Sequence, residues 1–176
     1  NLMTDTAVAL PLGFEPKVGD ELKQPPRHPR GGLIYRGLVM RIGFLATLMS
    51  LGVFGIFVWS YHIHDAEHLA KAQTMAFCAL VAFQWFSAFN ARSDEHTVWR
   101  LGRLRNRYLL ICIALAVMLQ LAVVYVPFLQ EAFGTVALGG WDWLVIFGSG
   151  AALFLIEETR KAVAPKLFSR GKWLPA

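Results

Sequence analysis

The chain has 176 residues, of which 56% are hydrophobic and only 16% are charged, and its mean hydropathy is +0.46. Soluble domains carry about one-quarter charged residues, so this composition excludes an ordinary soluble domain and favours a protein embedded in a membrane. The net charge of +5 is compatible with a nucleic-acid partner, but the basic residues alternate with apolar segments along the chain. That distribution is typical of a membrane protein and argues against nucleic acid.

The first segment, residues 1–13, is predicted to be a short helix that ends on the cytoplasmic side of a membrane. At 1.5 Å per residue its first twelve residues would be only ~18 Å long, which is too short to cross a bilayer core of about 30 Å. We therefore expect a longer membrane helix whose outer half lies outside this sequence. The alternative is an amphipathic helix in the membrane interface, although the segment lacks the basic face of such helices.

A cytoplasmic loop is predicted over residues 14–34, where PPRHP favours extended backbone. Long, nearly uncharged runs follow, each roughly 16–23 residues in length, about enough to cross the bilayer core as a helix. They predict four membrane-spanning helices, followed by a cytoplasmic tail: 35–61, 72–91, 107–126 and 141–163, with the tail at 164–176. The predicted fold is an all-α membrane protein, a partial helix followed by a four-helix transmembrane bundle.

The distribution of basic residues predicts the orientation of these helices. Every Lys and Arg except Lys71 lies in one of three segments: 17–41, 92–107 and 160–172. Basic loops of membrane proteins remain in the cytoplasm, so these segments and the C-terminus are expected to be cytoplasmic. Residues 127–140 should form an outer loop, because Pro127 cannot continue the preceding helix. Aromatic residues suited to the headgroup boundary fall near the expected outer helix ends: Trp59, Tyr61, Tyr125, Trp141 and Trp143.

The strongest candidate for chemistry is a set of polar residues in the first segment. Asn1, Thr4 and Asp5 are spaced i, i+3 and i+4, so they share one face of the predicted helix. A carboxylate at membrane depth is expensive and points to a functional site. Three oxygen ligands, one of them anionic, suit a hard cation such as Ca²⁺, Mn²⁺ or Na⁺. The alternative is that Asp5 only caps a helix.

Two other groups of residues could also bind a metal. His62, His64 and His68 cluster in an outer connection and could hold a transition metal. Titratable residues in a short exposed loop, however, need no special explanation. Cys78 and Cys112 lie in two different apolar runs, so they are expected in the core or facing lipid and not in a disulfide or metal site.

Charged residues near the cytoplasmic helix ends have simpler explanations. Glu157 and Glu158 precede Arg160 and Lys161 at a spacing typical of local charge pairs. The basic segment 100–107 is expected to meet anionic lipid headgroups.

Several motifs, in order, resemble calcium-transporting P-type ATPases. NLMTDTAVALPLGFEP followed by QPPRHPRGGLI is similar to the family's sixth transmembrane helix and the loop after it, with the patterns N-L-[VM]-T-D, G-F-x-P and P-P-R-x-P. QTMAFCALVAFQWFSAFNARS resembles the eighth helix, and YVPFLQEAFGTVALGGWDWL resembles the connection between the ninth and tenth helices. The resemblance covers essentially the whole chain and implies part of the sixth helix followed by helices seven to ten.

The resemblance also implies roles for individual residues. The family's N-x-x-T-D residues donate oxygen ligands to the transported ion, and here they are Asn1, Thr4 and Asp5. Some two-site calcium pumps have a ligating Glu in the eighth helix, and the aligned residue here is Gln84. A neutral amide can still coordinate an ion, but an interhelical hydrogen bond explains Gln84 equally well. The resemblance therefore favours one high-affinity ion site and leaves a second in doubt.

The implied function is the membrane part of an ATP-driven pump that exports Ca²⁺ from the cytoplasm. The phosphorylation motif D-K-T-G-T does not occur in this sequence, so ATP and Mg²⁺ would act in domains outside it. The expected partners are the lipid bilayer and the remaining helices and domains of the same pump, and no nucleic acid. Three alternatives remain: a secondary cation transporter or channel, a P-type pump for Mn²⁺, Na⁺ or H⁺, and a membrane metalloenzyme built on the histidines.

Overall fold

The computed structural model describes residues 6, 9–14, 36–63, 69–92 and 106–164. These residues form a short 3-10 helix and five α-helices: η1 (Leu10–Phe14), α2 (Arg36–Ile63), α3 (Leu69–Ala91), α5 (Arg107–Tyr125), α6 (Pro127–Phe133) and α7 (Gly140–Val163). No β-strand occurs in these ranges. Four helices, α2, α3, α5 and α7, contain stretches long and apolar enough to cross a membrane. The predicted all-α membrane fold is therefore confirmed.

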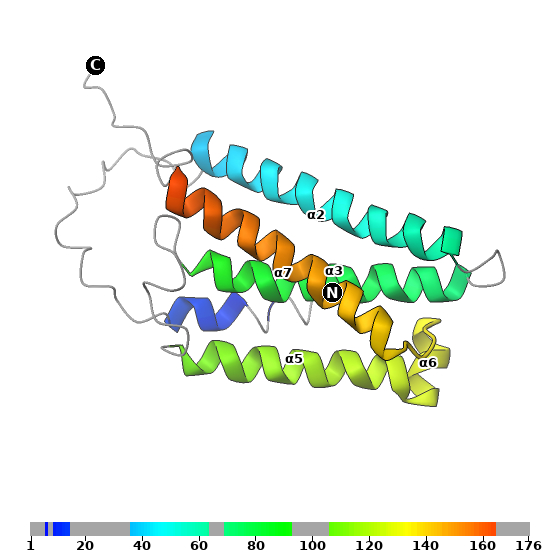
Figure 1. Cartoon of the computed structure of the whole chain (residues 1–176). Coiled ribbons are helices and arrows are strands. Elements are labelled where there is room, and N and C mark those ends of the chain that lie inside the picture. Colours follow the sequence, from blue (N-terminus) through cyan, green and yellow to red (C-terminus); the bar gives the residue numbers. More distant parts are fainter. Residues whose placement is uncertain (1–5, 7–8, 15–35, 64–68, 93–105, 165–176) are drawn as a thin grey trace, which may run out of the picture.

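The long helices lie side by side, and α3 is the central one (Figure 1). It packs most extensively against α2 and α7 and touches α5 over a smaller area. In its most apolar stretch 56% of the residues are buried, against 6% in α2. The two ends of the bundle differ, because α6 lies at one end and η1 packs against α5 at the other (Figure 1).

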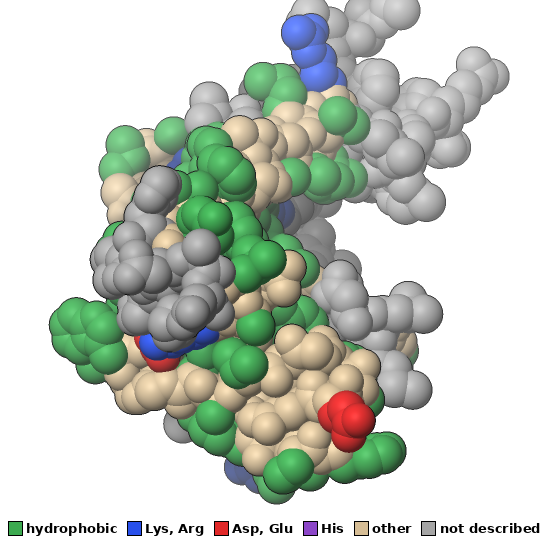
Figure 2. All heavy atoms as spheres, turned by 90° about the vertical axis from the view of Figure 1, so that its right-hand side faces the viewer, with side chains coloured by type: hydrophobic (Ala, Val, Ile, Leu, Met, Phe, Trp, Pro, Cys, Tyr) green, Lys and Arg blue, Asp and Glu red, His purple; other side chains and the backbone are tan. Residues whose placement is uncertain are grey.

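The outward surfaces of the long helices are apolar. Phe54, Met118 and Leu144, on α2, α5 and α7, are each 64–66% exposed. A soluble protein would not expose large apolar side chains on every such helix, whereas the hydrocarbon core of a bilayer accommodates them. Figure 2, which looks onto the α6 end, likewise shows many hydrophobic side chains and few charged ones. These surfaces identify the chain as an integral, multi-pass membrane protein.

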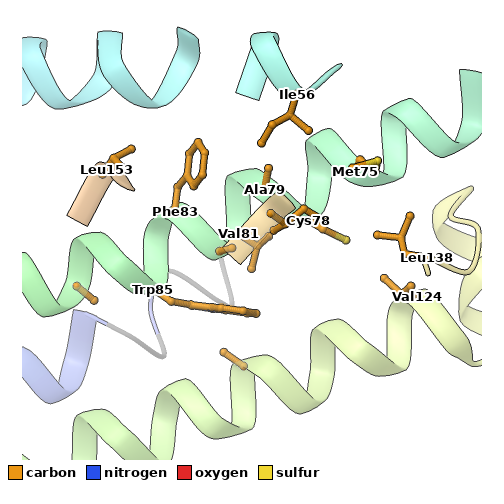
Figure 3. Close-up of a cluster of buried hydrophobic side chains, with 14 of the residues drawn as sticks. Ile56, Met75, Cys78, Ala79, Val81, Phe83, Trp85, Val124, Leu138 and Leu153 are labelled. Atoms are coloured by element: carbon orange, nitrogen blue, oxygen red, sulfur yellow. The ribbon is translucent and has the colours of Figure 1, made fainter. Parts of the chain in front are cut away.

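The core lies around α3. Met75, Cys78, Val81, Phe83 and Trp85 from this helix are all buried. Figure 3 shows them beside Ile56 of α2, Val124 of α5 and Leu153 of α7, so the core joins all four long helices.

Two glycines allow helices to approach α3 closely. A Cβ added at Gly150 of α7 would lie 2.5 Å from the ring of Phe86, and one added at Gly52 of α2 would lie 2.8 Å from the ring of Phe83. Small residues at such crossings let membrane helices pack tightly through van der Waals contact. Glycine at these two positions therefore sets the distance between α3 and its two main neighbours.

The helix ends follow from local chemistry. Asn106 caps α5, because its side-chain oxygen accepts a hydrogen bond from the backbone N–H of Leu109. Pro127 begins α6, where its missing N–H is not needed. Gly134 ends α6 with φ of 65°, a left-handed conformation that favours glycine. The Asp142 carboxylate accepts the Gly139 N–H at 2.8 Å and so fixes the start of α7.

The prediction for residues 127–140 was wrong in one respect, because this connection contains the helix α6. Proline ends a preceding helix, but it is also favoured at the first position of a new one, and Pro127 does both here. The other boundaries differ slightly: α3 begins at Leu69 instead of residue 72, and α2 extends to Ile63 instead of residue 61. Most of the predicted loop 14–34 and tail 164–176 lies outside the described residues.

Candidate functional site

The three predicted ion ligands, Asn1, Thr4 and Asp5, lie outside the described residues. The segment that follows them is described in part. Thr6 and Ala9 are helical, and the 3-10 helix η1 begins at Leu10. The ion site itself therefore stays a prediction, but the place where the following segment meets the bundle can be described.

The segment contacts the bundle through one side of η1. Pro11 is buried, and Leu12 packs against the hydrophobic core, whereas Leu10 is 64% exposed. Thr6 and Gly13 line an open hollow on the exposed side together with Ala9 and Leu10. One side of the segment is thus attached to this chain and the other side is open.

Asn106 links the segment to α5. Its Nδ2 donates a hydrogen bond to the backbone oxygen of Pro11 at 2.9 Å, and its Oδ1 accepts one from Leu109 N at 3.0 Å. The residue is only 3% exposed. Sequence reasoning missed Asn106, although an Asn directly before an apolar run is a typical helix N-cap. The contact with Pro11, 95 residues away, has no sequence signal.

Gln84, the further candidate ligand, lies on α3 and is partly buried. Its side-chain oxygen Oε1 is buried. The structure does not bring it together with the three predicted ligands, because those lie outside the described residues. A shared site therefore stays a prediction.

A buried ionic cluster lies at the end of the bundle away from α6. Glu157 of α7, 0% exposed, pairs with Arg41 of α2 at 3.2 Å and with Arg160 at 2.8 Å. Lys161, 2% exposed, pairs with Glu158 at 3.2 Å and donates to the backbone oxygen of Asn90 on α3 at 2.7 Å. The predicted local charge pairs are confirmed. The contacts with α2 and α3 were not predicted, because they depend on how the helices are rotated.

Among the described residues, the α6 end is held by neutral hydrogen bonds and by an ion pair. Thr74 of α3 accepts the Val136 N–H at 3.1 Å, and Thr135 donates to the Val123 backbone oxygen at 2.6 Å. Tyr125 donates to the Leu138 backbone oxygen at 2.7 Å. These contacts tie the connection after α6 to α3 and α5.

The start of α7 is attached to the same end. Lys71 of α3 pairs with Asp142 at 3.0 Å. Trp143 donates its indole N–H to the Tyr125 hydroxyl at 2.9 Å. Two of the aromatic residues predicted to lie at the outer helix ends therefore also join α5 to α7.

The histidine cluster and the two cysteines were the other residues considered for metal binding. In the part of the chain that the structure describes, no group of three or more His, Cys, Asp or Glu could hold a metal ion. His64 and His68 lie outside the described residues, and the His62 side chain is not described either, so their cluster stays a prediction. Cys78 lies in the core as expected and accepts a hydrogen bond from Gln120 at 3.2 Å. Cys112 is partly buried.

Comparison with known proteins identifies the family. A family model described as "Cation transporting ATPase, C-terminus" matches residues 1–163. The "Calcium-transporting ATPase" of Bacillus subtilis is 36% identical over 151 residues, which cover 86% of this chain and 17% of that protein. The human "Calcium-transporting ATPase type 2C member 2" is 34% identical, over 92% of this chain and 17% of that protein.

A more distant relative is the "Probable cation-transporting ATPase F" of Mycobacterium tuberculosis, which is 30% identical over 159 residues, or 90% of this chain. The chain spans only 17% of the length of these relatives. The family model matches nearly the whole length of the chain, and the four spanning helices are those expected of a C-terminal membrane domain. The chain belongs to the family of C-terminal transmembrane domains of cation-transporting P-type ATPases.

Proposed function

We propose that this chain is the C-terminal membrane part of an ATP-driven pump that exports Ca²⁺ from the cytoplasm. The observation that carries the proposal is the match of 86–92% of the chain to two proteins named as calcium-transporting ATPases. The relative named only as a cation-transporting ATPase keeps Mn²⁺, Na⁺ and H⁺ as the competing ions.

The ATP chemistry belongs to the rest of the pump. The chain spans only 17% of the length of these relatives and has no D-K-T-G-T motif. ATP and Mg²⁺ would act in domains outside this sequence. No residue of this chain is proposed to be catalytic.

The chain's own contribution to transport is part of the ion site. Asn1, Thr4 and Asp5 would supply three oxygen ligands, one of them anionic, and Gln84 is the candidate for a neutral fourth. Ca²⁺ takes about six to eight oxygen ligands, so the others would come from water and from helices outside this sequence. One carboxylate and neutral oxygens favour a hard cation over zinc or copper.

The described helices would serve as the anchor for the moving part of the pump. The core around α3, the buried ionic cluster and the bonds at the α6 end hold all four spanning helices together. A rigid anchor suits this role, because movement of the ion-site helices changes ion affinity only if they move against something fixed.

The proposal also assigns an orientation. The described part of the chain has seven basic residues, and all except Lys71 lie toward the end away from α6. These six are Arg36, Arg41, Arg92, Arg107, Arg160 and Lys161. By the positive-inside rule this end faces the cytoplasm and α6 faces outward. The first segment would then meet α5 at the cytoplasmic side.

Asp5→Asn in the longer pump tests the proposed function. We expect this variant to lose Ca²⁺-dependent phosphorylation by ATP, because the only charged ligand offered by this chain becomes neutral. The measurement is phosphoenzyme formed from labelled ATP over a range of Ca²⁺ concentrations. Glu131→Gln, which removes a carboxylate at an exposed position of α6, is the control and should behave like the unaltered pump.

Three results would contradict the proposal. Unchanged Ca²⁺ affinity in Asp5→Asn would remove the ion-site assignment. Phosphorylation that depends on Mn²⁺, Na⁺ or H⁺ but not on Ca²⁺ would mean that the pump transports that other ion. Ca²⁺ movement into vesicles without ATP would favour a secondary transporter or channel.

A further inference from the structure

Two hydrogen bonds of the Asn106 side chain join different elements. Its Oδ1 accepts the Leu109 N–H at 3.0 Å and so caps α5. Its Nδ2 donates to the Pro11 backbone oxygen at 2.9 Å. Asn106 is 3% exposed and Pro11 is buried, so the bond is shielded from water. One side chain therefore connects the start of α5 with the segment that follows Asp5.

Only a carboxamide serves both ends of this link well. A carboxylate or a hydroxyl can accept the N–H at a helix N-terminus, but an ionised carboxylate has no hydrogen to donate and a serine hydroxyl is shorter. When a buried carbonyl oxygen loses its hydrogen-bond donor, the folded state is destabilised unless another donor takes its place. The cap of α5 needs only the side-chain oxygen of Asn106, whereas the bond to Pro11 also needs its NH₂ group.

We propose that Asn106 is a positioning residue for the transported ion. By holding Pro11 against α5, it fixes the cytoplasmic end of the segment that carries Asn1, Thr4 and Asp5. This inference rests on the proposed function, because it takes those three residues as ion ligands. Pro11 follows Asp5 by six residues, so movement at Pro11 is transmitted along a short stretch to the ligands. Ion affinity depends on ligands that are already held in place when the ion arrives.

The attachment of η1 supports this role. Of its described residues, Pro11 and Leu12 face the bundle, while Leu10 and Gly13 are exposed. The segment packs mainly against α5. Because α5 is in turn tied to α3 by the Gln120–Cys78 hydrogen bond and to α7 by the Trp143–Tyr125 hydrogen bond, Asn106 places the segment relative to the whole anchor.

Three substitutions at this position separate positioning from capping. Asn106→Asp and Asn106→Ser keep an acceptor for Leu109 N but lose the donor to Pro11. Asn106→Ala loses both. If Asn106 only stabilises α5, the first two variants should resemble the unaltered pump. If it positions the segment, all three should bind Ca²⁺ more weakly.

The experiment measures Ca²⁺-dependent phosphorylation by ATP in the longer pump. We expect the Ca²⁺ concentration for half-maximal phosphoenzyme to rise about fivefold in Asn106→Asp and Asn106→Ser, with a nearly unchanged maximal level. Asn106→Ala should show the same shift and also unfold at a lower temperature. Thr135→Val removes another buried bond to a backbone oxygen, at the opposite end, and should leave the half-maximal concentration unchanged.

Hydrogen–deuterium exchange tests the contact directly. Amides in residues 10–14 should exchange faster in Asn106→Asp, while those in α7 should not. Unchanged exchange in residues 10–14 together with an unchanged half-maximal concentration would overturn the inference and leave the proposed function standing. If the unaltered pump itself shows no Ca²⁺-dependent phosphorylation, the proposed function fails, and this inference fails with it.

Discussion

At the scale of single residues, the structure depends on buried charges that form ion pairs. Glu157 is 0% exposed and contacts two guanidinium groups, Arg41 on α2 and Arg160 on its own helix. Burying a carboxylate alone would be prohibitive, and its two partners offset that cost. Removing one member of the group therefore lowers the stability of the fold by leaving a buried charge without its partner.

Glu157→Gln is expected to destabilise the protein strongly. The substitution leaves Arg41 and Arg160 buried without their carboxylate, which costs about 3–5 kcal/mol when a buried pair is broken. The measurement is thermal unfolding of the detergent-purified pump, followed by loss of monodisperse protein. Glu131→Gln makes the same chemical change at an exposed position on α6 and should have little effect. Equal stability of the two variants would contradict the importance of the cluster.

At the scale of helices, packing depends on where small residues lie. Gly148 and Gly150 are two residues apart on α7, but their surroundings differ. A Cβ at Gly148 would meet nothing within 4 Å, whereas one at Gly150 would lie 2.5 Å from the Phe86 ring. That ring also contacts Phe154, with centroids 6.3 Å apart, so its freedom to move is limited.

Gly150→Ala should therefore destabilise the protein, whereas Gly148→Ala should not. The first forces α7 away from α3 or displaces the Phe86 ring, at a cost of about 1–3 kcal/mol for overpacking. The second should be neutral or stabilising by up to about 1 kcal/mol, because alanine restricts the unfolded chain more than glycine does. Thermal unfolding of the two purified variants measures the difference. Equal destabilisation would show that the α3–α7 contact is looser than described.

How far the sequence predicts this structure also varies by element. The four spanning helices follow from long uncharged runs, because a bilayer demands about twenty apolar residues per crossing. The short helix α6 carries no such signal, and Pro127 fits both the end of one helix and the start of another. Arg41 and Glu157 lie 116 residues apart, so their pairing depends on helix rotation and could not be predicted. The same holds for Asn106 and Pro11.

The predicted ion ligands illustrate a different limit. The prediction of Asn1, Thr4 and Asp5 rests on helical spacing and on resemblance to a family, and both arguments concern sequence alone. An ion site of six to eight oxygens needs several helices, and the three predicted ligands would come from only one of them. The structure adds the attachment of the segment that follows these residues, through Pro11 and Asn106, which no sequence pattern contains.

At the scale of the whole molecule, the two ends of the bundle differ in charge. Toward the end away from α6 the described residues include six basic side chains, and at the α6 end they include Lys71 alone, paired with Asp142. Figure 2 shows the α6 end with few charged side chains. This asymmetry is the physical basis of the proposed orientation, because basic segments resist transfer across the membrane.

Cysteine labelling in intact cells tests that orientation. In a longer pump whose cysteines are all replaced by alanine, Cys78 and Cys112 among them, Glu131→Cys on α6 and Val163→Cys at the end of α7 each provide one thiol at an exposed position. A membrane-impermeant maleimide should label Glu131→Cys from outside, and should label Val163→Cys only after permeabilisation. The reverse pattern would mean an inverted orientation. Labelling of both from one side would mean that α7 does not span the membrane, because these two positions flank only that spanning helix.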